Sequence, residues 1–126
     1  MLTAPQVARA QSPYDAAFAA STKLDADAFY AEHPYRSASD VLDYIEKCAA
    51  PGDANAVLQA FEYFGKKYPM YSIGATKGMI LDSAVATAKP RRIVEVGSFL
   101  GYSAVRMAAK LPGDGTLACV EGNPEF

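Results

Sequence analysis

Residues 91–103 read RRIVEVGSFLGYS, and this stretch decides the fold of the chain. Its β-branched run predicts a strand over residues 92–96, of the kind that is buried on both faces of a parallel sheet. A loop with two glycines follows, and a helix is predicted over residues 101–111. A second strand is predicted over residues 116–121. The order strand, glycine loop, helix and strand indicates the start of a doubly wound α/β sheet.

Helical periodicity dominates the segment upstream of the first strand. Three helices are predicted there, over residues 40–49, 54–67 and 76–88. Ser39 and Asp53 are expected to cap the first two of them. Residues 1–38 are rich in alanine and interrupted by prolines. We expect these residues to form a loosely packed leader, with short helical segments near residues 15–20 and 25–32.

The number of strands suggests an unfinished sheet. Only two strands fit after Arg91, whereas a doubly wound sheet usually has about five or more. We therefore expect residues 39–126 to be the N-terminal part of a larger α/β domain, with a helical cap and a sheet that stops after its second strand.

Composition excludes several classes of function. The chain has 12 Lys and Arg against 14 Asp and Glu, which argues against a nucleic-acid partner. Its apolar runs are far shorter than the ~18 residues of a membrane span. Cys48 and Cys119, with a single histidine, encode neither a zinc site nor a disulfide framework, and we expect two buried thiols. A cytoplasmic protein is expected, and targeting to an organelle through residues 1–38 is the alternative.

The glycine loop predicts a ligand site. Gly97 and Gly101 allow a sharp turn and a close approach of ligand to main chain. The helix that begins near Gly101 directs free N–H groups at this place, which suits a carboxylate or a phosphate. Ser103 is a further donor. The plain alternatives are that the glycines only form a turn and that Ser103 is an ordinary first-turn residue.

Two acidic residues flank this loop in sequence. Glu121 ends the second strand, 26 positions after Glu95 (121 minus 95), where an acid in such units accepts hydrogen bonds from ribose hydroxyls. A ribose-bearing ligand is therefore predicted. Phe99 replaces the middle glycine of the dinucleotide motif and disfavours NAD. Glu95 either contacts the ligand or pairs with Arg91 or Arg92.

Residues 95–108, EVGSFLGYSAVRMA, closely resemble the nucleotide loop of the catechol O-methyltransferase family. The resemblance extends in the same order over residues 40–126. Its other matching positions are residues 44–46, 51–53 and 57–58, Gly74, residues 77–78, Asp82 and residues 121–124. A string of this length is more specific than a lone glycine motif. It implies the Rossmann-like fold of S-adenosylmethionine-dependent methyltransferases.

The family implies transfer of a methyl group from S-adenosylmethionine to a hydroxyl of a catechol, assisted by Mg²⁺. The complete enzyme is expected to be a monomer that does not associate with a membrane. The residues implied in donor binding are Ile73, through its main chain, Glu95, Gly97, Phe99, Ser103 and Glu121. Glu121 would hold the ribose hydroxyls, Ser103 and the backbone near Gly97 the methionine end, and Glu95 the amino group. Tyr71 would lie near the methyl group and the catechol. The family's metal ligands and catalytic lysine follow its second strand, so neither metal-binding nor catalytic residues are expected here, and this chain alone should be inactive.

Three positions depart from the family pattern. Pro69 replaces an aromatic gatekeeper, Tyr71 stands where the family has a methionine, and Gly122 replaces a methionine that follows the ribose-binding acid. These changes leave a methyltransferase for another hydroxylated small molecule as an alternative. A second alternative is a non-catalytic module that associates through exposed sheet edges.

Overall fold

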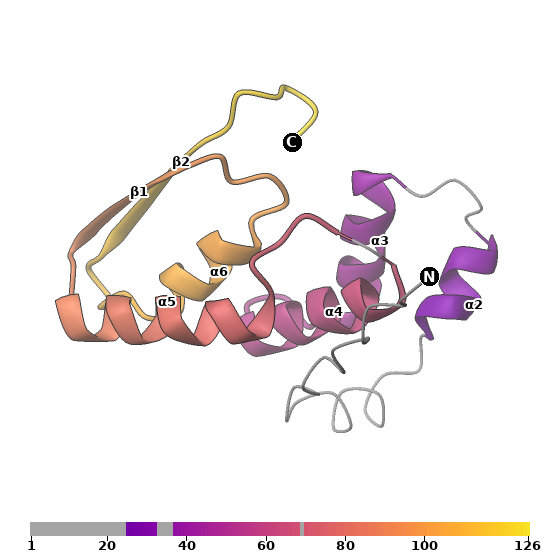
Figure 1. Cartoon of the computed structure of the whole chain (residues 1–126), viewed down its shortest axis with the longest axis horizontal. Coiled ribbons are helices and arrows are strands. Elements are labelled where there is room, and N and C mark those ends of the chain that lie inside the picture. Colours follow the sequence, from indigo (N-terminus) through magenta and orange to yellow (C-terminus); the bar gives the residue numbers. More distant parts are fainter. Residues whose placement is uncertain (1–24, 33–36, 69) are drawn as a thin grey trace, which may run out of the picture.

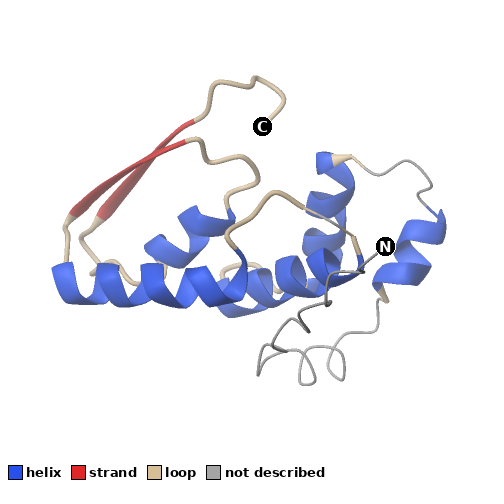
Figure 2. Ribbon diagram, in the orientation of Figure 1, coloured by secondary structure: helices blue, strands red, loops and turns tan. Residues whose placement is uncertain are grey.

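The computed structural model describes residues 25–32, 37–68 and 70–126, and it combines a helical region with a small parallel sheet (Figures 1 and 2). The elements are α2 (Ala26–Glu32), α3 (Ala38–Cys48), α4 (Ala54–Lys67), α5 (Gly74–Ala88), β1 (Arg92–Val96), α6 (Tyr102–Ala108) and β2 (Thr116–Val120). We call α2, α3 and α4 the helical cap, and β1, α6 and β2 the α/β unit. No helix in the described ranges has both the length and the apolar character needed to cross a membrane.

The helix starts test the predicted caps. Asp53 caps α4 as predicted, because its Oδ1 accepts a hydrogen bond from the Ala56 N–H at 3.0 Å. The prediction that Ser39 caps α3 is wrong. The N-cap is Ser37, whose N–H donates to Asp40 Oδ2 at 2.6 Å, and Ser39 lies within the first turn. Asp40 is three residues after Ser37, which is the spacing of a capping box.

Two other helices differ from their predicted bounds. α5 begins at Gly74, two residues earlier than expected, and α6 ends at Ala108, three residues earlier. Gly74 has φ +67°, a left-handed conformation that glycine adopts without steric cost. Lys110 and Leu111 donate their N–H groups to the carbonyls of Met107 and Ala108, three residues back, so the chain tightens after α6 into turns.

The second short helix of the predicted leader is present as α2, but it is not loosely packed. Ala26 and Phe29 are fully buried. The Phe29 ring meets Tyr44 edge-on at 5.6 Å between centroids and Phe64 at 6.4 Å. The Phe29 side chain, on the inner face of α2, therefore packs α2 against α3 and α4. The other predicted leader helix, near residues 15–20, lies outside the described residues.

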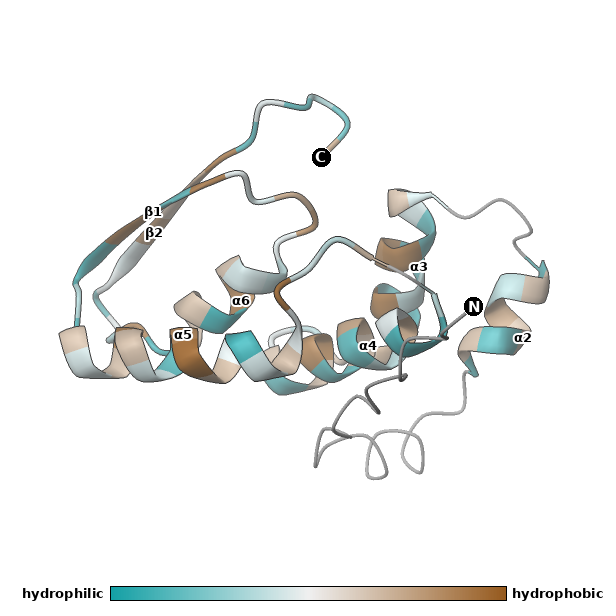
Figure 3. Cartoon of the chain, in the orientation of Figure 1, coloured by the Kyte–Doolittle hydropathy of each residue, from teal (hydrophilic) through white to brown (hydrophobic). Residues whose placement is uncertain are grey.

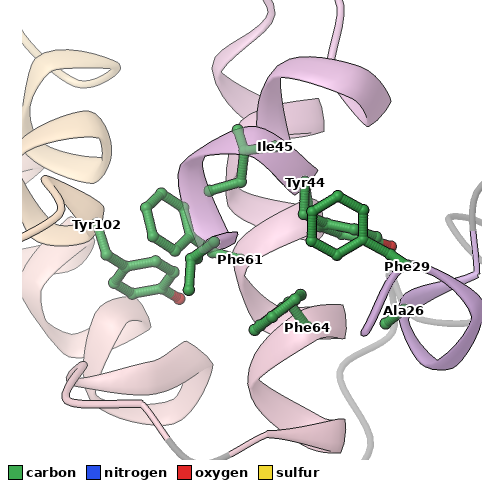
Figure 4. Packing of buried hydrophobic residues seen from close by; sticks show 9 residues of the cluster. Ala26, Phe29, Tyr44, Ile45, Phe61, Phe64 and Tyr102 are labelled. Atoms are coloured by element: carbon green, nitrogen blue, oxygen red, sulfur yellow. The ribbon is translucent and has the colours of Figure 1, made fainter. Parts of the chain in front are cut away.

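Aromatic side chains make the core of the helical cap (Figure 4). The buried cluster comprises Ala26, Phe29, Val41, Tyr44, Ile45, Ala60, Phe61, Phe64 and Tyr102. α4 lies at its centre and contacts α2, α3 and α6. Tyr102, the first residue of α6, is the member that comes from the α/β unit, so this side chain joins the two regions.

The two strands pair in parallel, from Arg92 opposite Thr116 to Val96 opposite Val120, and α6 connects them. The Gly97 N–H extends the ladder by donating to the Val120 carbonyl at 2.8 Å. α6 lies between the sheet and α5 (Figure 1). The parallel pair joined by a helix confirms the predicted α/β class.

The prediction that the first strand is buried on both faces is wrong for the described residues. Val94 and Val96 are 67% and 81% exposed, and Val120 of β2 is 54% exposed. The intervening Glu95 is 9% exposed, because it points toward the side on which α6 packs. Figure 3 shows the apolar residues along both strands. The α/β unit therefore packs through one face of its sheet.

Candidate functional site

The glycine loop between β1 and α6 has three residues in the left-handed region of backbone conformation. Gly97 has φ +83° and Gly101 has φ +81°. A Cβ built on either glycine would meet no atom within 4 Å, so conformation rather than crowding explains the glycines. The Gly101 N–H donates to the Ser98 carbonyl at 2.8 Å and closes the turn. The space above both glycines is open, as a main-chain binding site requires.

Phe99 holds the third left-handed conformation, with φ +48°, which is uncommon for a residue with a side chain. Two contacts support it. The Phe99 N–H donates to Glu121 Oε2 at 2.8 Å, and the Phe99 ring meets Phe126 edge-on at 4.6 Å between centroids. Strained backbone of this kind persists where its surroundings fix it and is concentrated at functional sites.

Glu121 lies at the loop, as the sequence predicts, and it bonds the loop itself. Its Oε1 accepts from the Asn123 N–H at 2.9 Å, and its Oε2 accepts from Phe99. The hydrogen bonds from Asn123 and then Phe99 lower the pKa of Glu121 below its ordinary value. The carboxylate is therefore an ionised acceptor, and each of its oxygens keeps a lone pair for a ligand hydroxyl.

Glu95 is buried behind the loop. Its Oε1 accepts a short hydrogen bond from the Ser103 hydroxyl, and its Oε2 accepts one from the Cys119 thiol at 3.5 Å. The alternative that Glu95 pairs with Arg91 or Arg92 is not realised among the described residues, where the Glu95 carboxylate bonds Ser103 and Cys119. Arg91 instead pairs with Asp114. The structure thus brings Glu95 and Ser103 together in one hydrogen-bonded group.

The prediction of two buried thiols is wrong for Cys119. Cys48 is half-buried, whereas Cys119 is exposed, and both are free thiols. Cys119 stands on β2 opposite Glu95 in the parallel register. Partial loss of water around the thiol, and then its hydrogen bond to the Glu95 carboxylate, raise the pKa of Cys119. Cys119 is therefore a protonated donor to Glu95 near neutral pH.

A cavity of about 350 Å³ lies between the glycine loop and the segment that precedes α5. It is lined by Phe61, Met70, Tyr71, Ser72, Ile73, Gly97, Ser98, Phe99, Leu100, Tyr102 and Ser103. Five residues that the sequence singled out thus surround one cavity. Glu95 and Glu121 do not line it, and each instead bonds a residue that does.

Several lining residues were missed by the sequence reasoning. No sequence motif marks Phe61 or Tyr102 as a site residue, and both are buried in the core, yet each also forms cavity wall. Nothing in the sequence distinguished Met70 and Leu100 from the residues beside them as site residues. Tyr71 is 92% exposed, so its side chain stands at the mouth rather than inside. Pro69, the other departure noted in this loop, lies outside the described residues.

The lining suits a ligand with both apolar and polar parts. Aromatic and aliphatic side chains form most of the wall, while backbone groups of the loop and the Ser103 hydroxyl supply polar contacts. Within the described ranges, no three His, Cys, Asp or Glu side chains gather as metal ligands would. The arrangement can bind and orient a ligand.

Comparison with known proteins assigns the class. The family described as O-methyltransferase matches residues 52–126, which is more than half of the sequence, and the chain belongs to this family. It is 37% identical over 87 residues to catechol O-methyltransferase of Mus musculus, covering 68% of this chain and 33% of the relative. It is 35% identical over 88 residues to catechol O-methyltransferase B of Danio rerio, with the same two coverages.

A solved structure of the O-methyltransferase TomG from Streptomyces achromogenes, in complex with SAM, is also similar. It shares 27% identity at a TM-score of 0.48 and covers 70% of this chain and 39% of that one. The chain spans about a third of the length of the curated relatives it matches. The resemblance of residues 95–108 to this family is confirmed. With the parallel α/β unit, family membership confirms the predicted Rossmann-like fold class.

Proposed function

We propose that this chain supplies the donor-binding half of an S-adenosylmethionine-dependent O-methyltransferase that acts on a catechol. The observation that carries the proposal is the cavity walled by the glycine loop, with an ionised Glu121 bonded to the same loop. Membership of the O-methyltransferase family supports the donor and the reaction class. The relatives named catechol O-methyltransferase support the acceptor.

The residues of the site have separable tasks in this proposal. Glu121 accepts hydrogen bonds from the ribose hydroxyls, because its oxygens keep lone pairs after bonding Phe99 and Asn123. Glu95 and Ser103 form the polar end of the site, where the amino and carboxylate groups of the methionine portion bind. Ile73 contributes main-chain contacts from the opposite wall.

S-adenosylmethionine supplies a methyl group on a positively charged sulfonium. The chain's part in the transfer is to hold the donor in one orientation and to exclude water from it, since in-line displacement depends on positioning. Mg²⁺, which the family resemblance implies for the complete enzyme, has no ligand cluster in the described parts of this chain. We therefore assign no step to it here.

Isothermal titration calorimetry with S-adenosylhomocysteine tests donor binding by the full chain. We expect binding, and we expect Glu121→Gln to weaken it about tenfold, because hydrogen bonds to a charged acceptor are lost. Glu125→Gln is the matched control, since this exposed carboxylate lies four residues further along the same segment. Equal affinities of the wild type and the Glu121 variant would remove Glu121 from the site.

A non-catalytic interaction module is the second candidate function. The exposed valines of the sheet, Val94, Val96 and Val120, favour it because an open apolar face can associate. Sedimentation velocity distinguishes the two candidates. A stable assembly that forms without the donor, from a chain that binds no S-adenosylhomocysteine, would support the module over the enzyme.

A further inference from the structure

A largely buried group of four side chains links α4 of the helical cap with α5 and α6. Arg106, on α6, is 7% exposed and binds Asp82 of α5 through Nε at 3.2 Å and Nη2 at 2.7 Å. Its Nη1 donates to Glu62 Oε1 of α4 at 3.2 Å and to the Tyr102 hydroxyl at 2.9 Å. Tyr102 in turn donates to Glu62 Oε1 at 2.6 Å. We call these four residues the Arg106 cluster.

The charges of the Arg106 cluster are held out of water. Burial opposes the charge of Arg106, but hydrogen bonds to Asp82 and Tyr102 outweigh it and raise the pKa of the guanidinium. Burial, and then the hydrogen bond to Glu62, raise the pKa of Tyr102, so this hydroxyl remains a donor. Glu62 Oε2 is buried and finds no partner within the described part of the chain. Such a group keeps its geometry because each partner depends on the others.

Gly78 of α5 lets the cluster form. A Cβ at Gly78 would lie 2.5 Å from Arg106 Cζ and 2.5 Å from Nε. The backbone of α5 therefore runs directly against the guanidinium. The distance between α5 and α6 is set by this contact, and the cluster is a close-packed junction of three helices.

The Arg106 cluster reaches the candidate site through Tyr102. Tyr102 directly follows Gly101 and lines the cavity, and its ring meets Phe61 edge-on at 5.6 Å between centroids. Phe61 also lines the cavity and precedes Glu62 in α4. The hydroxyl of Tyr102 is thus hydrogen-bonded to Glu62, the residue that follows Phe61 in sequence.

We propose that Glu62, Asp82 and Arg106 are positioning residues for donor binding, acting by fixing the Tyr102 ring and the end of the glycine loop against Phe61. This inference rests on the proposed function. A role confined to stability would change the unfolding midpoint and leave the affinity of the folded protein unaltered. A positioning role changes the affinity of the folded protein for its ligand.

Two conservative variants test the inference in calorimetric titrations of the full chain with S-adenosylhomocysteine. Tyr102→Phe keeps the ring and removes its hydroxyl, and Glu62→Gln keeps the shape and removes the charge. We expect each to weaken binding about fivefold, under conditions in which circular dichroism shows the variant folded. The double variant should bind within about twofold of either single one, because Tyr102→Phe removes the same hydrogen bond that Glu62→Gln weakens by taking the charge off its acceptor.

Val41→Ala is the control, because Val41 is buried in the helical cap and does not line the cavity. It should lower the urea midpoint and keep the affinity within about twofold of the wild type. Wild-type affinity in both cluster variants, additive losses in the double variant, or an equal loss in Val41→Ala would each overturn the positioning role. If the wild type binds no S-adenosylhomocysteine, the proposed function fails, and this inference fails with it.

Discussion

The helical cap and the sheet of the α/β unit differ in how completely they are packed. Phe29, Tyr44 and Phe64 of the cap are almost fully buried, whereas Val94 and Val96 of β1 are mostly exposed. The cap contains the hydrophobic core but contributes few residues to the candidate site. The α/β unit carries the glycine loop but has little core of its own. Stability and binding are therefore concentrated in different regions, and α6 joins them.

The largest effect should come from emptying the core of the cap. Phe64→Ala removes a fully buried ring and should lower the free energy of unfolding by ~3–5 kcal/mol. Val96→Ala, at an 81% exposed position of the sheet, should cost less than about 0.5 kcal/mol. Urea unfolding followed by circular dichroism measures both. Similar losses of unfolding free energy in the two variants would contradict the difference in packing between the cap and the sheet.

Removing the cation at the junction should have the next largest effect. Arg106→Met leaves two largely buried carboxylates without their counter-ion and should cost ~3 kcal/mol in urea unfolding. The matched control is Arg91→Met, because the pair of Arg91 with Asp114 is exposed and should contribute less than about 1 kcal/mol. A loss at Arg106 as small as that at Arg91 would show that α6 is not anchored through this cluster.

A smaller loss is expected in the glycine loop. Gly97→Ala places a Cβ in a left-handed conformation and should cost ~1–2 kcal/mol, although the space around it is open. Gly113→Ala is the control, because Gly113 has neither a positive φ nor a close neighbour. Equal urea midpoints for Gly97→Ala and the wild type would show that the loop does not require its left-handed conformation.

The smallest effect should be a pH dependence from Glu121. Its pKa in the folded chain lies below the ordinary value of 4.5, so its stabilising contribution is present above about pH 4.5 and is lost as the pH falls through the folded pKa. Glu121→Gln should flatten this part of the stability curve between about pH 5 and about pH 3. Urea midpoints of both proteins across that range provide the test, and identical slopes would contradict it.

Local patterns predicted much of the α/β unit. The change from helical period to a β-branched run placed β1, and the turn that follows α6 placed β2. Glu121 was expected near the glycine loop because it ends the second strand, where an acid in such α/β units accepts hydrogen bonds from ribose hydroxyls. That inference depends only on strand order, which short-range sequence signals determine.

Features that depend on packing between elements could not be predicted. The Ser37 cap is an exception, because the capping-box spacing from Ser37 to Asp40 is present in the sequence and could have distinguished Ser37 from Ser39. The apolar residues of β1 show that the strand can be buried, but they do not show which segments cover it. The Arg106 cluster joins residues from three helices, so no periodicity within one helix contains it.

Nuclear magnetic resonance of the ¹⁵N-labelled chain, titrated with S-adenosylhomocysteine, tests the central claim most directly. We expect the amide shifts to concentrate in residues 97–103 and 71–73 and at Glu121, which surround the cavity or bond its loop. The amides of residues 52–55 and 109–110, which line a separate surface hollow, should remain unchanged. An absence of shifts in the glycine loop at saturating ligand, or shifts centred on that second hollow, would contradict the account.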